Sequence, residues 1–156
     1  MIDVEVPGFG RLEIEHLVLD YNGTLAVDGH LIDGVAEDLN ALAERLTVHV
    51  VTADTFGRAG EALAGVRCRL QILPPGGQDM AKRDFVRKLG PDRVACIGNG
   101  RNDRLMLREA ALGVAVILAE GASGLALADA DVVFVDIRAA LALFSRPLRL
   151  VATLRS

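Results

Sequence analysis

Aromatic residues are scarce in this sequence, which has no tryptophan, one tyrosine and five phenylalanines. Basic side chains are not clustered either: 17 Lys and Arg residues are scattered among 21 Asp and Glu residues, for a formal net charge of -4. Proteins that bind nucleic acid usually combine a basic stripe with aromatic rings on which bases stack. A nucleic acid is therefore not expected as a partner.

Cysteine is also rare. Cys68 and Cys96 lie far apart, have no CxxC spacing and no neighbouring histidine, and both fall in apolar strand-like runs. Small core residues fit this pattern better than a disulfide or a metal site does. Such cysteine usage agrees with a reducing cytoplasm.

No apolar run is long enough to cross a bilayer, which takes about 20 residues. The longest nearly apolar stretch extends from Ala110 to Ala119. The first residues, Met1 to Glu5, have neither the basic n-region nor the apolar h-region of a signal peptide. We therefore expect a cytoplasmic protein with no membrane partner.

What the sequence does contain is a regular alternation of strand-like and helical segments. A chain of 156 residues is long enough for one domain with a substantial core. We predict a single domain over 1–156, with an N-terminal hairpin over about 3–15, a core over about 16–136 and a C-terminal helical tail over about 137–156. A second, small hairpin is predicted from the runs 25–27 and 30–32, on either side of Asp28-Gly29.

Apolar spacing places the remaining elements. Strands are predicted at 17–19, 47–52, 68–72, 94–97, 114–116 and 132–135, and helices at 33–46, 54–63, 80–89, 102–111, 125–128, 137–144 and 148–154. Asp33 is the expected N-cap of the first of these helices. The alternation predicts a three-layer, doubly wound, Rossmann-like α/β fold with a parallel sheet. In the common strand order of such sheets, 17–19 and 94–97 are neighbours at the switch point where ligands bind.

Four polar segments are expected to face that point. They are Asp20 to Thr24, Thr52 to Asp54, Lys82, and Gly98 to Asp103. Taken singly, each has an ordinary structural explanation: Asp20 could cap a turn, Thr52 could be a strand residue and Lys82 a solvated helix residue. Their common order along strand ends is the more specific signal.

Together, these segments resemble the haloacid dehalogenase (HAD) superfamily of phosphotransferases. More narrowly, they are similar to the phosphorylation domain of P-type ATPases and to its small soluble relatives. The resemblance extends from about Leu17 to Asp136. It implies an HAD-like fold that is capless apart from a small β-hairpin flap, a Mg²⁺ cofactor, and hydrolysis of a phosphorylated substrate through an aspartyl-phosphate.

The resemblance also implies roles for individual residues. Asp20 matches the nucleophile, because an ionised carboxylate attacks phosphorus without needing a base. Thr52 matches the hydroxyl residue that hydrogen-bonds the phosphoryl oxygens, and Lys82 matches the cation that neutralises them. Arg83 and Lys88 remain alternatives to Lys82. Backbone amides around Asn22, Gly23 and Ala53 would complete the phosphate site.

The metal site implied by the resemblance consists of Asp20, the backbone carbonyl of Asn22, Asn99 and Asp103. Magnesium prefers hard oxygen ligands and keeps several waters, so a few protein oxygens suffice. Its charge would offset the repulsion between Asp20 and an anionic phosphate.

Two positions depart from the family pattern. Most HAD phosphatases have a second Asp two residues after the nucleophile, which protonates the leaving group and then activates water, and here this residue is Asn22. An amide cannot transfer that proton, so hydrolysis should be slower by about 10²- to 10⁴-fold. Asn99 stands where the metal-binding loop normally has an Asp, which should lower the affinity for Mg²⁺.

The spacing between these residues leaves no room for a cap. The segments from Asp20 to Thr52 and from Thr52 to Lys82 are too short for the cap of many HAD enzymes or for the nucleotide-binding insertion of a P-type pump. ATP is therefore not expected as a specific substrate, and the physiological substrate is not identified. Because capless relatives often assemble, the resemblance also allows a homo-oligomer.

Other polar residues have weaker functional interpretations. Gly98 to Asp103 is a poor dinucleotide fingerprint, because Asp103 replaces the third glycine and the segment follows the wrong strand. His16, His30 and His49 share no ligand spacing, Asp54 fits a helix cap better than a metal ligand, and Arg101 could contact phosphate or face solvent. The alternative to a phosphohydrolase is a catalytically impaired, phosphate- or metal-binding HAD-like protein with a regulatory or interaction role.

Overall fold

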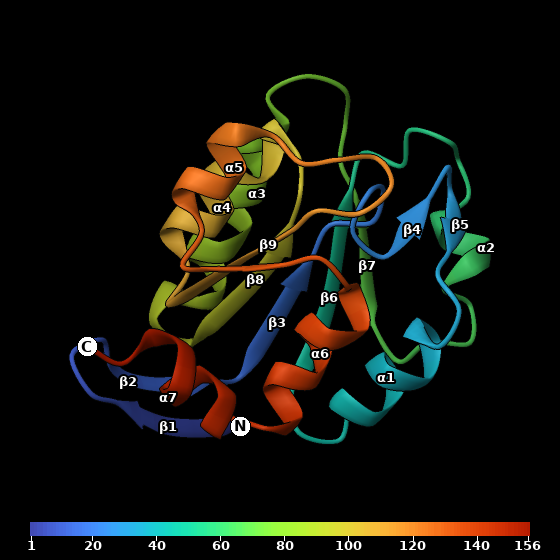
Figure 1. Ribbon diagram of the computed structural model, residues 1–156. Helices are drawn as coiled ribbons and strands as arrows, with labels where there is room; N and C mark the ends of the chain where they lie inside the picture. The colour runs from blue at the N-terminus through green and yellow to red at the C-terminus, as the bar shows by residue number, and fades with distance from the viewer.

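A six-stranded parallel sheet forms the centre of the molecule (Figure 1). The computed structural model describes residues 1–156. The strand order is β10-β9-β8-β3-β6-β7. The strands are β3 (His16–Leu19), β6 (Thr47–Thr52), β7 (Arg69–Ile72), β8 (Val94–Gly98), β9 (Leu112–Val116) and β10 (Val132–Phe134).

Helices cover both faces of this sheet, as Figure 1 shows. On one face, α1 (Val35–Leu42), α2 (Ala59–Ala62) and α6 (Ile137–Ser145) contribute side chains to the larger core. On the other, α3 (Gln78–Leu89), α4 (Arg104–Glu109) and α5 (Gly124–Asp129) pack over a smaller core. Successive residues of a strand face opposite sides, so Leu17 and Leu19 enter the larger core and Val18 enters the smaller one.

Two antiparallel hairpins lie outside the central sheet. Strands β1 (Ile2–Val6) and β2 (Gly10–Ile14) pack against α7 (Leu148–Leu154) and the 3₁₀ turn η1 (Pro91–Arg93). The second hairpin, β4 (Ala26–Val27) and β5 (His30–Leu31), follows Asp20 as predicted. No helix has the length and apolar character that crossing a membrane would require.

The predicted three-layer, doubly wound α/β fold is confirmed, and so is the predicted neighbour relation within the sheet. His16 to Leu19 pair in parallel with Val94 to Ile97, so β3 lies directly beside β8. Strand β6 flanks β3 on its other side. The carboxyl ends of β6, β3 and β8 therefore meet at one end of the sheet.

The expected cap of the first helix is wrong. Gly34, not Asp33, precedes α1, and it adopts a φ of 85°. This left-handed conformation favours glycine, and a Cβ there would also require the Arg138 guanidinium, 2.6 Å away, to move. Helix α6 packs beside α1, and its buried side chains belong to the larger core.

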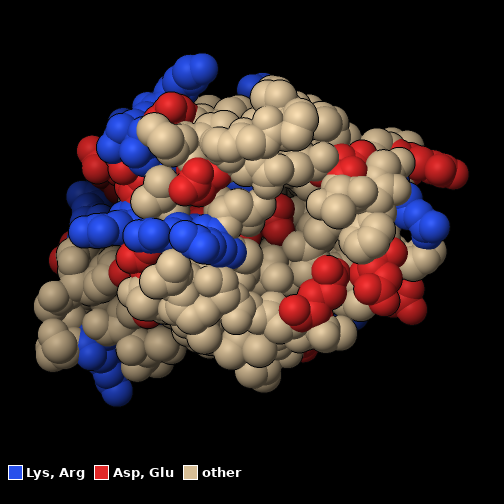
Figure 2. Space-filling model, turned by 90° about the horizontal axis from the view of Figure 1, so that it is seen from above, with Lys and Arg blue, Asp and Glu red and all other residues tan.

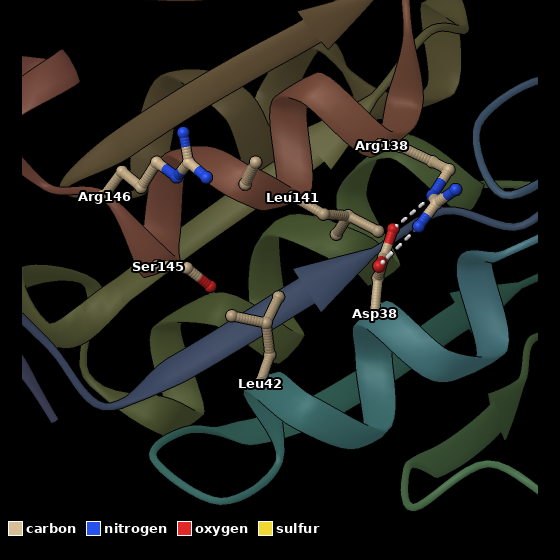
Figure 3. A pocket seen from close by; sticks show the side chains of 7 residues that line it. Asp38, Leu42, Arg138, Leu141, Ser145 and Arg146 are labelled. Carbon is tan, nitrogen blue, oxygen red and sulfur yellow. Dashed lines mark hydrogen bonds and ion pairs between the residues drawn. The ribbon is translucent and has the colours of Figure 1, made fainter.

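A shallow hollow of about 260 Å³ marks the contact between α1 and α6 (Figure 3). Arg138 donates two hydrogen bonds to Asp38 at one end of it, at 2.7 and 3.1 Å. The other labelled side chains are Leu42, Leu141, Ser145 and Arg146. The hollow lies between two helices of one layer, away from the strand ends, and an interhelical ion pair closes one end of it.

Candidate active site

Asp20 lies immediately beyond the end of β3, at the centre of the sheet. Its backbone N–H donates to the carbonyl of Ile97 in β8 at 3.0 Å, which fixes the residue between the two strands. The residue is only 6% exposed. Figure 2 looks down on this end of the molecule, where a hollow near the centre has acidic side chains in and around it. This is the position predicted for Asp20 from the strand that precedes it.

Lys82 joins Asp20 to the segment that follows β8. Its ammonium donates to Oδ1 of Asp20 and to Oδ1 of Asp103, both at 2.7 Å, and its side chain is fully buried. The predicted alternatives point elsewhere, because Arg83 pairs with Asp84 and Lys88 is exposed. A lysine that is withdrawn from water to bridge two carboxylates is the most specific electrostatic feature of this site.

Asp103 is more heavily engaged than the sequence suggested. Besides the bond from Lys82, its Oδ2 accepts hydrogen bonds from the backbone N–H groups of Asn99 and Gly100, at 3.0 and 2.8 Å. Gly98 permits this approach, since a Cβ there would lie 2.5 Å from Cγ of Asp103. Both carboxylate oxygens therefore hold the loop and the lysine, an arrangement that favours a positioning role over direct metal coordination.

Thr52 ends β6 beside Asp20 and is almost completely buried, at 1% exposure. Its hydroxyl oxygen accepts a hydrogen bond from the Asp54 N–H at 2.9 Å, so the hydroxyl proton stays free to be donated.

Asp54 itself accepts hydrogen bonds from the N–H groups of Arg58 and Ala59, at 2.9 and 3.0 Å. It therefore acts as a cap before α2, in agreement with the preferred interpretation of its sequence.

The turn after Asp20 supplies fewer free amides than expected. The Gly23 N–H already donates to the carbonyl of Ala26 at 2.8 Å, so the predicted phosphate contact of Gly23 is not available in this arrangement. The need for glycine is steric instead: its φ is +75°, and a Cβ would lie 2.3 Å from Nδ2 of Asn99. The N–H groups of Asn22 and Ala53, in contrast, donate no hydrogen bond within the protein. They remain candidate donors to a phosphate.

Asn99 is held by two hydrogen bonds that the sequence did not predict. Its Oδ1 accepts from the hydroxyl of Thr24 at 3.1 Å, and its Nδ2 donates to the carbonyl of Gly121 at 3.0 Å. Thr24 is fully buried. In the sequence, its position four residues after Asp20 was the only indication that Thr24 belongs to the site. As it stands, the Asn99 amide links three loops rather than facing an open ligand position.

Burial and charge shift the ionisation of the central groups. Burial, and after it the charge of Asp103, raises the pKa of Asp20 to about 6, although Lys82 acts in the opposite direction. Burial alone would lower the pKa of Lys82, but Asp103 and Asp20 outweigh it and the pKa is raised. At neutral pH Asp20 is therefore mostly ionised and Lys82 stays cationic.

The donor set provides a test of whether Mg²⁺ fits. Oδ1 of Asn22 is buried and has no hydrogen-bond partner, and the carbonyl of Asn22 accepts no hydrogen bond within the protein. Oδ2 of Asp20 also has no side-chain partner. No three His, Cys, Asp or Glu residues lie close enough together to hold a metal ion by themselves. Mg²⁺ prefers hard oxygen ligands, so the oxygens of Asp20 and Asn22 fit the ion. Asp20 supplies the single carboxylate of this set, because both oxygens of Asp103 are already hydrogen-bonded.

Comparison with solved structures identifies the fold. The chain superimposes with a TM-score of 0.71 on the cobalt-bound deoxy-D-mannose-octulosonate 8-phosphate phosphatase of Haemophilus influenzae, at 14% identity, over 92% of this chain and 94% of that one. It matches a putative HAD family hydrolase of Streptomyces avermitilis with a TM-score of 0.67, at 21% identity, over 85% and 84% of the two chains. The protein has the HAD fold.

A relative at the sequence level is the uncharacterized protein MJ0073 of Methanocaldococcus jannaschii. It is 38% identical over 84 residues, which span 51% of this chain and 90% of that protein. The chain belongs to the same family as MJ0073. No family model matches the sequence.

The narrower likeness to P-type ATPases is not confirmed. A zinc-transporting PIB-type ATPase also superimposes, with a TM-score of 0.59 at 21% identity, over 78% of this chain and 20% of that one. This TM-score is below those of the two hydrolases described above, 0.67 and 0.71. The fold therefore does not single out the P-type subgroup.

Proposed function

We propose that this chain is a Mg²⁺-dependent phosphohydrolase that acts through an aspartyl-phosphate at Asp20. The observation that carries the proposal is the fully buried ammonium of Lys82, 2.7 Å from one oxygen of Asp20 and 2.7 Å from one of Asp103. A buried cation beside an ionised carboxylate lets an anionic phosphate approach the nucleophile. The HAD fold of soluble phosphatases supports the same reaction class.

In the first half-reaction, a carboxylate oxygen of Asp20 attacks phosphorus while the bond from phosphorus to the leaving oxygen breaks. Lys82, the Thr52 hydroxyl and the N–H groups of Asn22 and Ala53 hold the transferring phosphoryl oxygens. Asp20 and Asn22 would hold Mg²⁺, whose charge would reduce the repulsion between nucleophile and phosphate. In the second half-reaction, water attacks the aspartyl-phosphate, phosphate departs and the carboxylate is restored.

Asn22 sets the speed of both halves. A carboxylic acid at this position could protonate the leaving oxygen and later deprotonate water, whereas an amide does neither. The leaving oxygen must therefore take its proton from water, which favours aryl and acyl phosphates whose leaving groups have a low pKa. Hydrolysis of the aspartyl-phosphate is expected to be the slower half, so the phosphoenzyme should accumulate.

The test is phosphate release from para-nitrophenyl phosphate with Mg²⁺, together with chemical trapping of the phosphoenzyme. Wild-type protein should release nitrophenol in a burst and carry a hydroxylamine-sensitive label, and Asp20→Ala should lose both. Asp92→Asn is the matched control, because Asp92 is exposed and has no side-chain partner. Activity that survives Asp20→Ala would exclude the mechanism. ATP in the same assay tests the P-type-like alternative.

A second candidate is a phosphate- or metal-binding protein that has lost turnover. It is favoured by the two amides at Asn22 and Asn99, and by the engagement of the Asn99 side chain with Thr24 and Gly121. Calorimetric binding of Mg²⁺ or a phosphate mimic, without product from a broad panel of phosphate esters, would support it. A nitrophenol burst would exclude it.

A further inference from the structure

The central sheet ends in two open edges, β7 on one side and β10 on the other. A strand with one neighbour has backbone N–H and C=O groups that no other strand pairs, and such an edge is a template for a further strand. Neither strand contains the lysine or proline with which many edges prevent this pairing. Instead, Ile72 on β7 and Val133 on β10 are each 46% exposed. Both edges are therefore open to another polypeptide.

The existing hydrogen bonds show which backbone groups point outward, because successive residues of a strand in a parallel sheet turn their groups to opposite sides. The N–H of Leu73 donates to the carbonyl at the end of β6, so the groups of Leu70 and Ile72 point away from the sheet. At the other edge, the carbonyl of Phe134 accepts from the N–H of the residue directly after β9. The groups of Val133 therefore point outward.

We propose that the two edges form an interface between copies of this chain, in which β7 of one copy lies parallel to β10 of a second copy and extends its sheet. A parallel ladder places an outward residue of one strand between two outward residues of the other. Val133 of the second copy therefore fits between Leu70 and Ile72, opposite Gln71. The N–H of Val133 would donate to the carbonyl of Leu70, and the N–H of Ile72 to the carbonyl of Val133.

Apolar side chains match in this register. Leu70, Val132 and Phe134 pack against the larger core and Leu73 against the smaller one, so the pairing keeps both faces of the extended sheet continuous. It forms three apolar cross-strand pairs: Leu70 with Val132, Ile72 with Phe134, and Leu73 with Val135. Such pairs are the units that stabilise a sheet. Val135, which is 77% exposed in the single copy, would be covered by this contact.

Charge selects this contact over the symmetric ones. The same register sets Arg69 opposite Asp131 of the second copy. Arg69 is exposed and has no ion-pair partner within its own chain. Asp131 accepts from the Gly113 N–H through Oδ2, at 2.8 Å, and keeps Oδ1 for a partner. Two copies of β10 would instead gather Asp131 and Asp136 of both chains, and two copies of β7 would bring two Arg69 side chains together. The favoured contact is therefore heterologous.

A heterologous contact leaves a free edge at each end of a pair, so association continues beyond two copies. The paired strands have only four and three residues, so weak binding is expected. The first test is sedimentation equilibrium from about 10 μM to about 1 mM. Over this range, the average mass of the wild-type protein should rise past the mass of a dimer.

Two single substitutions block one edge each. Ile72→Lys places a charge opposite Phe134 and blocks β7, whereas Val133→Lys places a charge diagonal to Arg69 and blocks β10. Each variant alone should stay monomeric. In an equimolar mixture, the intact β10 of the first variant pairs with the intact β7 of the second, so the mass should rise to that of a dimer and stop there. Dimers in the mixture would also show that both variants are folded.

Leu148→Lys is the matched control, because Leu148 is 78% exposed on α7, outside both edges. It should associate like the wild type. Arg69→Glu tests the register, since it places two carboxylates opposite each other. It should raise the Kd of association by at least about tenfold.

The inference is overturned if the wild-type protein stays monomeric at every concentration, or if its mass levels off at that of a dimer. It is also overturned if either edge variant associates by itself like the wild type, or if their mixture remains monomeric. Association of Arg69→Glu as tight as that of the wild type would exclude the register.

Discussion

Replacing Lys82 by methionine tests the electrostatic account of the site most directly. Lys82 makes two 2.7 Å ion pairs and is fully buried, as is Asp103, while Asp20 is nearly so. Methionine conserves the length of the side chain and removes the charge. The two carboxylates would then share a buried site with no cation between them.

The expected cost follows from this burial. Removing one partner of a buried ion pair destabilises a protein by about 3–5 kcal/mol, because the remaining charge is left uncompensated. This is a large fraction of the roughly 5–15 kcal/mol that stabilises a typical domain. With a urea m-value of about 2 kcal/mol/M, the unfolding midpoint should fall by about 2 M.

The pH dependence of this cost gives the reasoning a second, independent check. Lys82 lowers the pKa of Asp20, so its loss should raise that pKa above about 6. A carboxyl group whose pKa is higher in the folded state binds its proton more tightly there, so folded-state stability is lost as pH rises. The difference in unfolding free energy between Lys82→Met and wild type should therefore be smaller at about pH 5 than at about pH 7.

Urea titrations followed by circular dichroism measure both quantities. The only other lysine of the chain, Lys88, is exposed on the same helix and provides the matched control. Lys88→Met should change the unfolding free energy by less than about 0.5 kcal/mol at either pH. The reasoning is refuted if Lys82→Met is as stable as Lys88→Met at neutral pH, or if its deficit does not shrink on acidification.

Three further predictions concern separate features. Asn22→Asp should accelerate loss of phosphate from the trapped phosphoenzyme by at least about tenfold, because it restores an acid-base group; an unchanged rate would contradict the role given to the amide. Burial, and next the charge of His16, lowers the pKa of the buried His49 to about 4, whereas the unfolded value is near 6.5, so the contribution of His49 to the unfolding free energy should fall by about 2 kcal/mol between about pH 7 and about pH 5. Urea midpoints should show that His49→Gln loses less than wild type over this range. Gly23→Ala should destabilise the fold, because Gly23 has a φ of +75° and its Cβ would meet the Asn99 amide at 2.3 Å; a melting temperature equal to that of wild type would show that the turn can relax.

Much of the fold follows from local pattern and chain connectivity. Alternating strands and helices require a parallel sheet, and a parallel sheet brings all its strand ends to one side. The positions of Asp20 and Thr52 at adjacent strand ends could therefore be predicted without contacts. Lys82 could be placed as well, because the apolar residues Val86 and Leu89 define the inward face of its helix.

Other predictions failed or were incomplete because they depended on groups distant in sequence. Gly34 precedes α1 in a left-handed conformation, and the Arg138 guanidinium, 104 positions later, packs against it. The Gly23 N–H donates to the carbonyl of Ala26 within the turn, and the residues of the turn did not by themselves predict this hydrogen bond. The bonds that tie Asn99 to Thr24 and Gly121 cross between three loops, which sequence spacing does not bring together.

The stretch from Leu17 to Thr24 shows most clearly which properties the sequence determined and which depended on the tertiary structure. The sequence alone determined that a buried strand delivers a carboxylate to the ligand-binding edge, and that the residue two positions later is an amide unable to move a proton. Only the tertiary structure decided that both carboxylate oxygens of Asp103 accept hydrogen bonds, from Lys82 and from the loop amides, and that Oδ1 of Asn22 has no hydrogen-bond partner. Residue type fixes which groups can carry charge or protons, whereas packing fixes which of their atoms remain free.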